Sequence, residues 1–424
     1  MRLRSSNQAR PERIGRGRSG RRVRRTAVSL RCLGLVMGMA ACATTASETR
    51  EEEPNTGRRV PSAPADAATD AAPGDADAAP CADCEYFPEA CSAEVLCPNG
   101  PFDPSAPGGG FDVRTQVNVI RGRSSSDVWA AGALGALAHY DGVSWSRLDP
   151  GNRETLRTLW LPDSAEISFG VFERVYARGA GMPTADAGPS PDGWTVHSPV
   201  TPPTYRSYDL QPVSAWAAPG AEWLWCATRA WRPGWTTGLW RMRVSPDSKF
   251  EFAHGASPQL CATLPCSHMT SVHGASADTL WAVGVEGATM RITNADGETP
   301  TIKAFNSQTF DALLGVWAAS DSEAWAVGAK GTIRHYAGQA LLWDVVSDVP
   351  TIEDLNAIWG SSAADVWAVG NAGVVLHYDG KVWSRVKVAG LGARRPDLTT
   401  VWVSADGHVW VGGQGVILSL GGKP

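Results

Sequence analysis

Residues 229–243 combine arginine and tryptophan in a pattern suited to ligand binding. Four side chains fall within seven positions: Arg229, Trp231, Arg232 and Trp235. A guanidinium group pairs with carboxylates or phosphates, and an indole face stacks on sugar or aromatic faces. We therefore predict a ligand-binding site at these four residues. A plainer interpretation is that the nearby Trp240 and Met242 are inward-facing strand residues, with Arg241 and Arg243 solvated on the other side.

The nine cysteines offer either metal ligands or disulfides. Cys81 and Cys84 form a C-x-x-C pair, but Cys91 and Cys97 do not make the second knuckle that a zinc ribbon needs. We expect these four to form two disulfides of undetermined pairing. Among the later cysteines we expect a Cys261–Cys266 bridge and a buried free Cys226. No metal site is predicted.

Motifs for catalysis or nucleotide binding are missing from the sequence. It holds no G-x-S-x-G elbow, no H-E-x-x-H and no phosphate loop, so no catalytic residue and no cofactor are predicted. The formal net charge of -5 over 424 residues excludes a generally basic, nucleic-acid-binding chain.

The first 42 residues have the character of an export signal. Residues 1–31 contain 11 arginines and one glutamate, and residues 32–42 are apolar but too short to span a bilayer as a helix. The ending Met39-Ala40-Ala41-Cys42 resembles the lipobox of bacterial lipoproteins. That resemblance implies a lipid on Cys42 and, because Ala43 rather than Asp follows, an outer-membrane location. An ordinary cleaved signal peptide is the alternative.

Three further segments follow the signal. Residues 43–80 are rich in Ala, Pro and Asp and supply too little apolar surface to fold, so they are expected to be a disordered linker. Residues 81–110 form a small Cys-rich segment. Residues 111–424 have a balanced composition and are expected to be the globular body.

The body is built from a repeat. The clearest copies are residues 315–328 and 357–370, and the Trp intervals from Trp281 to Trp410 are 44, 42 and 43 residues. A period of about 40–45 residues is typical of propeller blades. Counting two degenerate copies, seven units centre near residues 129, 168, 225, 281, 325, 367 and 410. Each unit reads as four short strands, so we predict an all-β, seven-bladed β-propeller.

Two side chains recur at fixed places in the repeat. Six Trp residues at one position are predicted to be core between blades: Trp129, Trp225, Trp281, Trp325, Trp367 and Trp410. A His before a Tyr recurs at 139, 335 and 377. Because the blades point apart, these His residues cannot converge on a single metal ion, and they are predicted to be structural. Asp141-Gly142 and Asp379-Gly380 are predicted to form two-residue type I′ turns.

The seventh unit ends before its outer strand. Closed rings of this kind usually borrow the missing strand from the other terminus, which removes an exposed edge. Phe102 lies at the matching distance before Val117, so we predict that residues near Phe102 supply the strand.

The repeat resembles bacterial β-propellers of the BNR or Asp-box type and the propeller of photosystem II assembly factors. The likeness spans roughly residues 117–424. Fold does not decide function. We expect a lipid-anchored, non-enzymatic binding or scaffold protein of the cell envelope, with an envelope protein or polysaccharide as partner and no nucleic acid. The alternative is an exported glycosidase or lyase.

Overall fold

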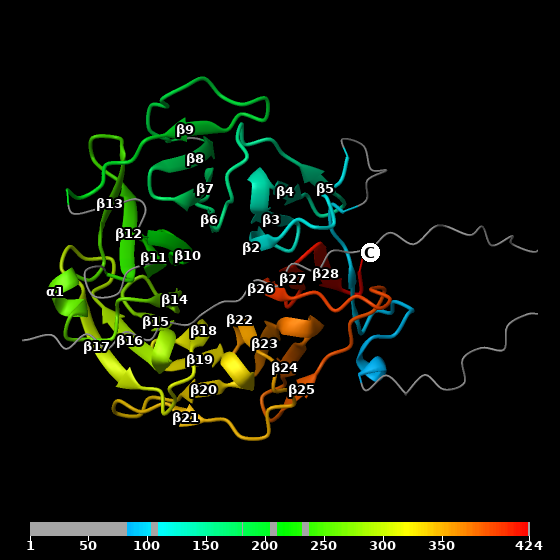
Figure 1. The fold of residues 1–424 in the computed structure, drawn as a ribbon. Helices are drawn as coiled ribbons and strands as arrows, with labels where there is room; N and C mark the ends of the chain where they lie inside the picture. Colours follow the sequence, from blue (N-terminus) through cyan, green and yellow to red (C-terminus); the bar gives the residue numbers. More distant parts are fainter. Residues whose placement is uncertain (1–82, 103–108, 180, 204–209, 231–236, 423–424) are drawn as a thin grey trace, which may run out of the picture. The chain divides into compact units, whose positions relative to one another are not determined.

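The computed structural model describes residues 83–422, apart from 103–108, 180, 204–209 and 231–236. All described residues belong to one compact unit. They form seven antiparallel four-stranded sheets, each a blade, arranged around a central axis (Figure 1). This confirms the predicted seven-bladed β-propeller. Among the described residues, no helix has the length and apolar character needed to cross a bilayer.

We number the blades I to VII along the chain. Their strands, innermost first, are as follows: blade I, β2 (Val117–Ser124), β3 (Asp127–Gly132), β4 (Leu137–Tyr140) and β5 (Trp145–Arg147); blade II, β6 (Thr158–Trp160), β7 (Ala165–Val171), β8 (Arg174–Gly179) and β9 (Thr195–His197); blade III, β10 (Leu210–Trp216), β11 (Leu224–Ala230), β12 (Leu239–Val244) and β13 (Phe250–His254). Blade IV has β14 (Met269–Gly274), β15 (Leu280–Gly284), β16 (Ala288–Thr293) and β17 (Thr301–Asn306); blade V, β18 (Leu313–Ser320), β19 (Glu323–Gly328), β20 (Ile333–Tyr336) and β21 (Asp344–Val345); blade VI, β22 (Leu355–Ser362), β23 (Asp365–Gly370), β24 (Val375–Tyr378) and β25 (Trp383–Arg385); blade VII, β26 (Leu398–Val403), β27 (Val409–Gly413), β28 (Val416–Leu420) and β1 (Leu96–Pro98).

Helical segments are few and short. The described residues contain the α-helix α1 (Pro258–Cys261) and five 3-10 turns: η1 (Cys84–Tyr86), η2 (Ala133–Gly135), η4 (Val285–Gly287), η5 (Ala329–Gly331) and η6 (Asn371–Gly373). Four of these turns join the second and third strands of blades I, IV, V and VI.

The ring closes through the N-terminal side of the propeller. Strand β1 pairs with β28 in antiparallel register, with Leu96 opposite Leu420. Leu96 is fully buried, and Gly421 N–H donates to the carbonyl of Val95. Closure by an upstream strand is therefore confirmed, but the strand is Leu96–Pro98 and not the region of Phe102. Pro101, three residues after the end of the strand, cannot donate to a sheet ladder.

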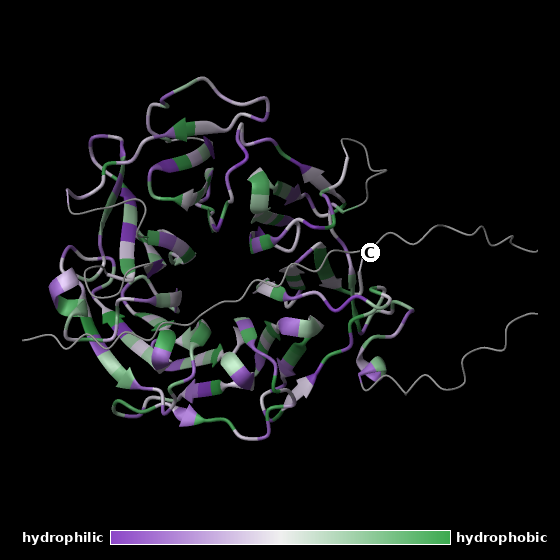
Figure 2. Cartoon of the chain, in the orientation of Figure 1, coloured by the Kyte–Doolittle hydropathy of each residue, from purple (hydrophilic) through white to green (hydrophobic). Residues whose placement is uncertain are grey.

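The recurring Trp residues form the core between blades, as predicted. Trp129, Trp225 and Trp410 are each at most 1% exposed, and their rings pack against the neighbouring sheets. Hydrophobic segments lie mainly on the strands (Figure 2). Because one blade cannot cover both of its faces, burial of these indoles requires the stacked ring.

The recurring His residues are structural, also as predicted. Nε2 of His139, His335 and His377 lies 2.9, 3.1 and 2.7 Å from the carboxylates of Asp127, Glu323 and Asp365. Each imidazole stacks on the core Trp of its own blade, with ring centroids 3.9–4.4 Å apart.

The hairpin turns differ from the prediction. Tyr140 pairs with Trp145, which leaves a four-residue loop instead of a two-residue type I′ turn. Gly142 has φ of 94°, but Asp141 does not have positive φ. The Asp141 carboxylate accepts the N–H groups of Val143 and Ser144, and the Asp141 N–H donates to the Ser144 carbonyl, so side-chain and backbone bonds together hold the turn.

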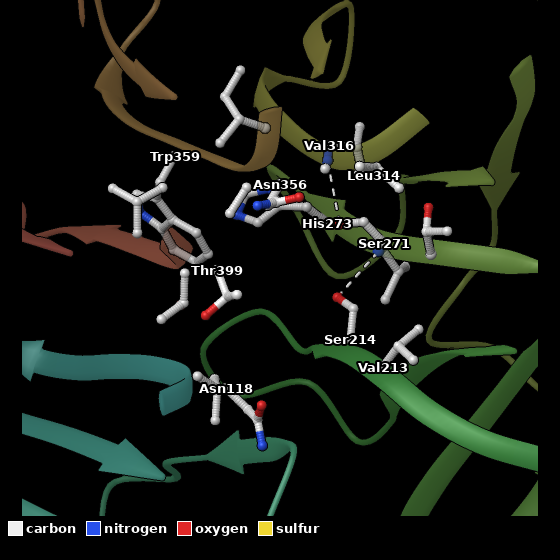
Figure 3. A pocket seen from close by; sticks show the side chains of 18 of the residues that line it. Asn118, Val213, Ser214, Ser271, His273, Leu314, Val316, Asn356, Trp359 and Thr399 are labelled. Atoms are coloured by element: carbon white, nitrogen blue, oxygen red, sulfur yellow. Dashed lines mark hydrogen bonds between the residues drawn. The ribbon is translucent and has the colours of Figure 1, made fainter. Parts of the chain in front are cut away.

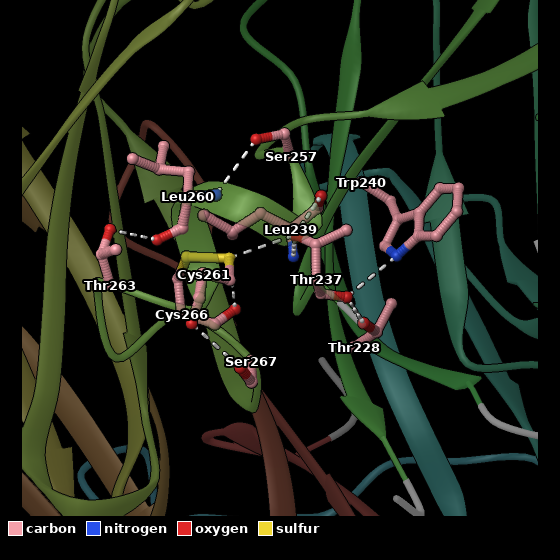
Figure 4. Close-up of a disulfide and its surroundings, with 10 residues drawn as sticks. All are labelled: Thr228, Thr237, Leu239, Trp240, Ser257, Leu260, Cys261, Thr263, Cys266 and Ser267. Carbon is pink, nitrogen blue, oxygen red and sulfur yellow. Dashed lines mark hydrogen bonds between the residues drawn. A yellow bond between two sulfur atoms is a disulfide. The ribbon is translucent and has the colours of Figure 1, made fainter. Parts of the chain in front are cut away.

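Two disulfides lie among the described residues. Cys261 and Cys266 are bridged as predicted, beside α1, whose first turn is capped by the Ser257 hydroxyl accepting from Leu260 N–H (Figure 4). Cys91 and Cys97 form the second bridge, next to strand β1. Cys84 is also disulfide-bonded, and Cys81 lies outside the described residues. Cys226 is a buried free thiol.

Candidate functional site

The predicted Arg/Trp site is described only in part. Arg229 is exposed near the end of β11, opposite Gln211 of β10. Trp231, Arg232 and Trp235 lie outside the described residues. Burial, and then the charge of Arg229, lower the pKa of Arg157, a residue that lines the central cavity.

In the neighbouring segment, the apolar residues are inward-facing strand residues, as the plainer interpretation predicts. Trp240 and Met242 are buried in the blade. Their arginine neighbours are not simply solvated. Arg241 and Arg243 lie 4.0 and 4.3 Å from the ring centre of Trp223, and Arg243 pairs with three glutamates. These contacts bind blade III to blade IV.

A second set of residues surrounds the axial channel. In each blade, one inner-strand residue lies directly opposite the second strand at the position of the core Trp. The seven residues, in blade order, are Arg121, Trp160, Trp216, His273, Trp317, Trp359 and Trp402. We call them the channel ring. Five are tryptophan, and blades I and IV place arginine and histidine instead.

Three of these indoles pack over glycine in the next blade. A Cβ added at Gly122 would lie 2.6 Å from the Trp402 ring, and one at Gly360 would lie 2.8 Å from Trp317. Trp216 approaches Gly274 in the same way. The glycines therefore give the rings room to lean across the blade boundary.

Hydroxyl groups join the inner strands just inside the channel ring. The hydroxyl of Ser214 accepts from Val272 N–H, and that of Ser271 accepts from Val316 N–H (Figure 3). Thr400 accepts from Ile120 N–H in the same position. These bonds join three pairs of neighbouring inner strands.

Arg121 and Trp359 meet across the channel. The guanidinium carbon lies 4.5 Å from the Trp359 ring centre, and Nη1 donates to the Ile120 carbonyl at 2.7 Å. Burial lowers the pKa of Arg121 to about 10, so the group remains charged at neutral pH. No carboxylate of the described chain lies within ion-pair distance of it.

His273, on the inner strand of blade IV, also contacts Trp359. Its Nδ1 accepts the N–H of Ala318 at 3.1 Å, which places the proton of the neutral ring on Nε2. Burial, and then the nearby positive charge of Arg121, hold the pKa of His273 well below its usual value. Its ring meets Trp359 edge to face at 4.7 Å. Trp359 is thus held between Arg121 and His273.

These side chains separate two spaces. An inner cavity of about 80 Å³ lies along the axis, with Asn118, Asn356 and Thr399 in its wall (Figure 3). A groove of about 530 Å³ opens on the other side of Arg121 and Trp359, toward solvent. Its remaining aromatic lining is Trp160, Trp216 and Trp402. Asp163 is the one carboxylate among the described residues that line either space.

Sequence reasoning missed the channel ring. The signal was present, since Trp317 and Trp359 each lie eight residues before a core Trp in the two clearest repeat copies. Their position on the innermost strand, opposite the core Trp, depends on the register of the first hairpin. Arg121 and His273 stand where other blades have Trp. Only the closed ring shows that these two residues lie near one another.

The fold defines the class of protein, a seven-bladed β-propeller, and comparison with solved structures agrees. YCF48 bound to a D1 peptide is 13% identical, with 73% of this chain and 92% of that chain covered and a TM-score of 0.53. Streptogramin B lyase is 13% identical over 75% and 95%, with a TM-score of 0.54. The extracellular domain of a hybrid two-component system from B. thetaiotaomicron is 13% identical over 77% and 39%, with a TM-score of 0.53.

These likenesses concern the fold alone. No family model matches the chain, and the curated proteins contain no match either. The resemblance to the propeller of photosystem II assembly factors therefore holds for architecture, and the comparisons give no support to its Asp-box part.

Proposed function

We propose that this chain is an exported, lipid-anchored β-propeller of the cell envelope that binds a protein or polysaccharide without converting it. Export is supported by the disulfides Cys91–Cys97 and Cys261–Cys266, because such bridges persist in oxidising compartments. The lipobox-like Cys42 and the linker of residues 43–80 would tether the propeller to the outer membrane.

The observation that carries the binding function is the groove. It exposes half-buried Trp160, Trp216 and Trp359 beside the guanidinium of Arg121, a combination found in ligand sites. Hydrolysis of a glycoside usually needs two carboxyl groups within about 10 Å of each other. The described lining supplies Asp163 alone.

The test is a binding screen with matched variants. The full chain is applied to arrays of envelope glycans and peptides, beside Trp160→Ala and Trp216→Ala. We expect each substitution to reduce retention of the captured ligand about tenfold or more. Phe310→Ala removes an aromatic side chain that is 92% exposed and outside the groove, so it should leave retention unchanged.

A turnover assay tests the alternative function, that of a glycosidase or lyase. The captured ligand is incubated with the protein and analysed for cleavage. Cleavage that disappears in Asp163→Asn would replace the binding function with an enzymatic one. The lyase among the similar structures makes this control necessary.

A further inference from the structure

Arg121 differs from the other arginine of the groove. Arg123 is fully engaged, because it pairs with Asp127 and Glu166 at 2.9 Å each and also donates to the carbonyls of Pro162 and Ala165. Among the described residues, Arg121 makes one hydrogen bond, to its own neighbour Ile120. Its guanidinium has five donors, so most of them have no partner in the described part of the chain, and the residue lines the groove.

A partly buried charge of this kind requires compensation. Removing a guanidinium from water is costly unless an opposite charge or hydrogen bonds replace the lost hydration. Around Arg121 the described chain supplies the face of Trp359, the neutral ring of His273 and one carbonyl oxygen. An anion entering from the groove would complete this environment, and a carboxylate matches the two-pronged geometry of arginine.

The walls of the groove indicate what carries the carboxylate. Indoles of Trp160, Trp216 and Trp402 line it beside small residues at 217–221. Such planar apolar faces suit the flat C–H face of a pyranose ring, whose hydroxyl groups stay in water. The groove volume of about 530 Å³ lies within the range of small-ligand sites.

We propose that the groove binds a hexuronic acid residue of an acidic polysaccharide, with its carboxylate on Arg121 and its ring on the neighbouring indoles. This inference rests on the binding function proposed above and specifies its ligand. A peptide fits less well. Trp160 and Trp216 are the last residues of β6 and β10, so the groove meets strand ends and not the open edge that an added peptide strand needs.

The experiment uses trigalacturonate and its methyl ester as probes. The full chain is titrated with each probe by calorimetry. We expect the ester to bind at least tenfold more weakly, because it keeps the sugar rings but removes the charge that pairs with Arg121.

Two variants assign the effect to Arg121. Arg121→Gln should weaken trigalacturonate binding about tenfold to a hundredfold, and Arg121→Lys should give an intermediate affinity because it keeps the charge without the paired donors. Arg147→Gln removes the same charge from the exposed outer strand of the same blade and should have no effect. Thermal unfolding of each variant shows that the propeller is intact.

The possible failures are distinguishable. Equal binding of the acid and its ester, or unchanged affinity of Arg121→Gln, would overturn the inference. So would absence of trigalacturonate binding when an acidic peptide binds in a Trp160-dependent manner, but that result would keep the proposed binding function. If no ligand binds in a manner that depends on the groove residues, both this inference and the proposed binding function are overturned.

Discussion

Asp365 Oδ1 accepts a hydrogen bond from the indole Nε1 of Trp367 at 2.9 Å. The same oxygen lies 2.7 Å from His377 Nε2, and His377 stacks on Trp367. Blade I repeats this arrangement with Asp127, Trp129 and His139. One carboxylate thus fixes a core indole and its stacking partner in each of these blades.

Replacing Asp365 by Ala should destabilise the propeller. The indole N–H and the imidazole would lose their acceptor, which costs about 1–3 kcal/mol in the free energy of unfolding. Chemical denaturation measures this loss. Asp163→Ala, at an exposed position in the groove, is the control and should change stability by less than about 0.5 kcal/mol. Equal effects of the two substitutions would show that the Asp365 contacts contribute nothing.

The same carboxyl group gives a pH dependence. Burial alone would raise the pKa of Asp365, but hydrogen bonds from Ser361, His377 and Trp367 outweigh it and hold the pKa below its ordinary value. The stabilising contribution is therefore complete above the unfolded pKa of about 4 and is lost as the pH falls through the lower folded value. Unfolding between pH 5 and 2 should be less pH-dependent in Asp365→Asn than in the natural protein.

Glu323→Asp should stabilise blade V. Glu323 reaches His335 at 3.1 Å, but Nε1 of the buried Trp325 has no hydrogen-bond partner among the described residues. The shorter carboxylate would occupy the place that Asp365 has in blade VI and accept both donors. We expect a gain of about 1 kcal/mol, measured by denaturant midpoint. A loss of stability would mean that the backbone of blade V cannot place the shorter side chain.

Leu96→Ala should open the ring. Leu96 is fully buried among Val388, Val416 and Leu418, and it lies on the strand that closes blade VII. Truncation should cost about 2–5 kcal/mol and lower the unfolding temperature. Leu342→Ala, at a residue that is 46% exposed, should have little effect. If both variants melt alike, closure by β1 is not important for stability.

Cys42→Ser should release the protein from membranes. A single thioether-linked lipid group is the anchor that the lipobox-like sequence implies, and the hydroxyl cannot replace it. Fractionation followed by detection of the full chain measures the partition. A Cys226→Ser variant, at the buried free thiol, should stay in the membrane fraction. Membrane retention of Cys42→Ser would contradict lipid anchoring.

Trp231 and Trp235 remain predicted ligand contacts. Changing both to Ala should weaken partner binding while the unfolding temperature stays nearly constant, because a site residue is not core. Arg229→Gln should act in the same direction, since Arg229 is exposed at the end of β11, beside this segment. A large fall in the unfolding temperature would instead assign these tryptophans to the core.

Local patterns determined the blades of this protein. The spacing of Trp281, Trp325, Trp367 and Trp410 sets the repeat, and the alternation of short apolar strands with turns sets the four-stranded sheet. Both depend on contacts between residues near in sequence, so they can be predicted without the closed ring. The Cys261–Cys266 bridge, five residues apart, could be predicted for the same reason.

Only the tertiary structure decided the candidate site. Arg121, His273 and Trp359 come from three blades and meet because ring closure brings equivalent inner-strand positions around one axis. The closing strand contains Leu96 and not the predicted Phe102, and this also depends on which residues can pair with β28. Contacts of this kind are set by the register and packing of all seven sheets together, which no local segment of the sequence encodes.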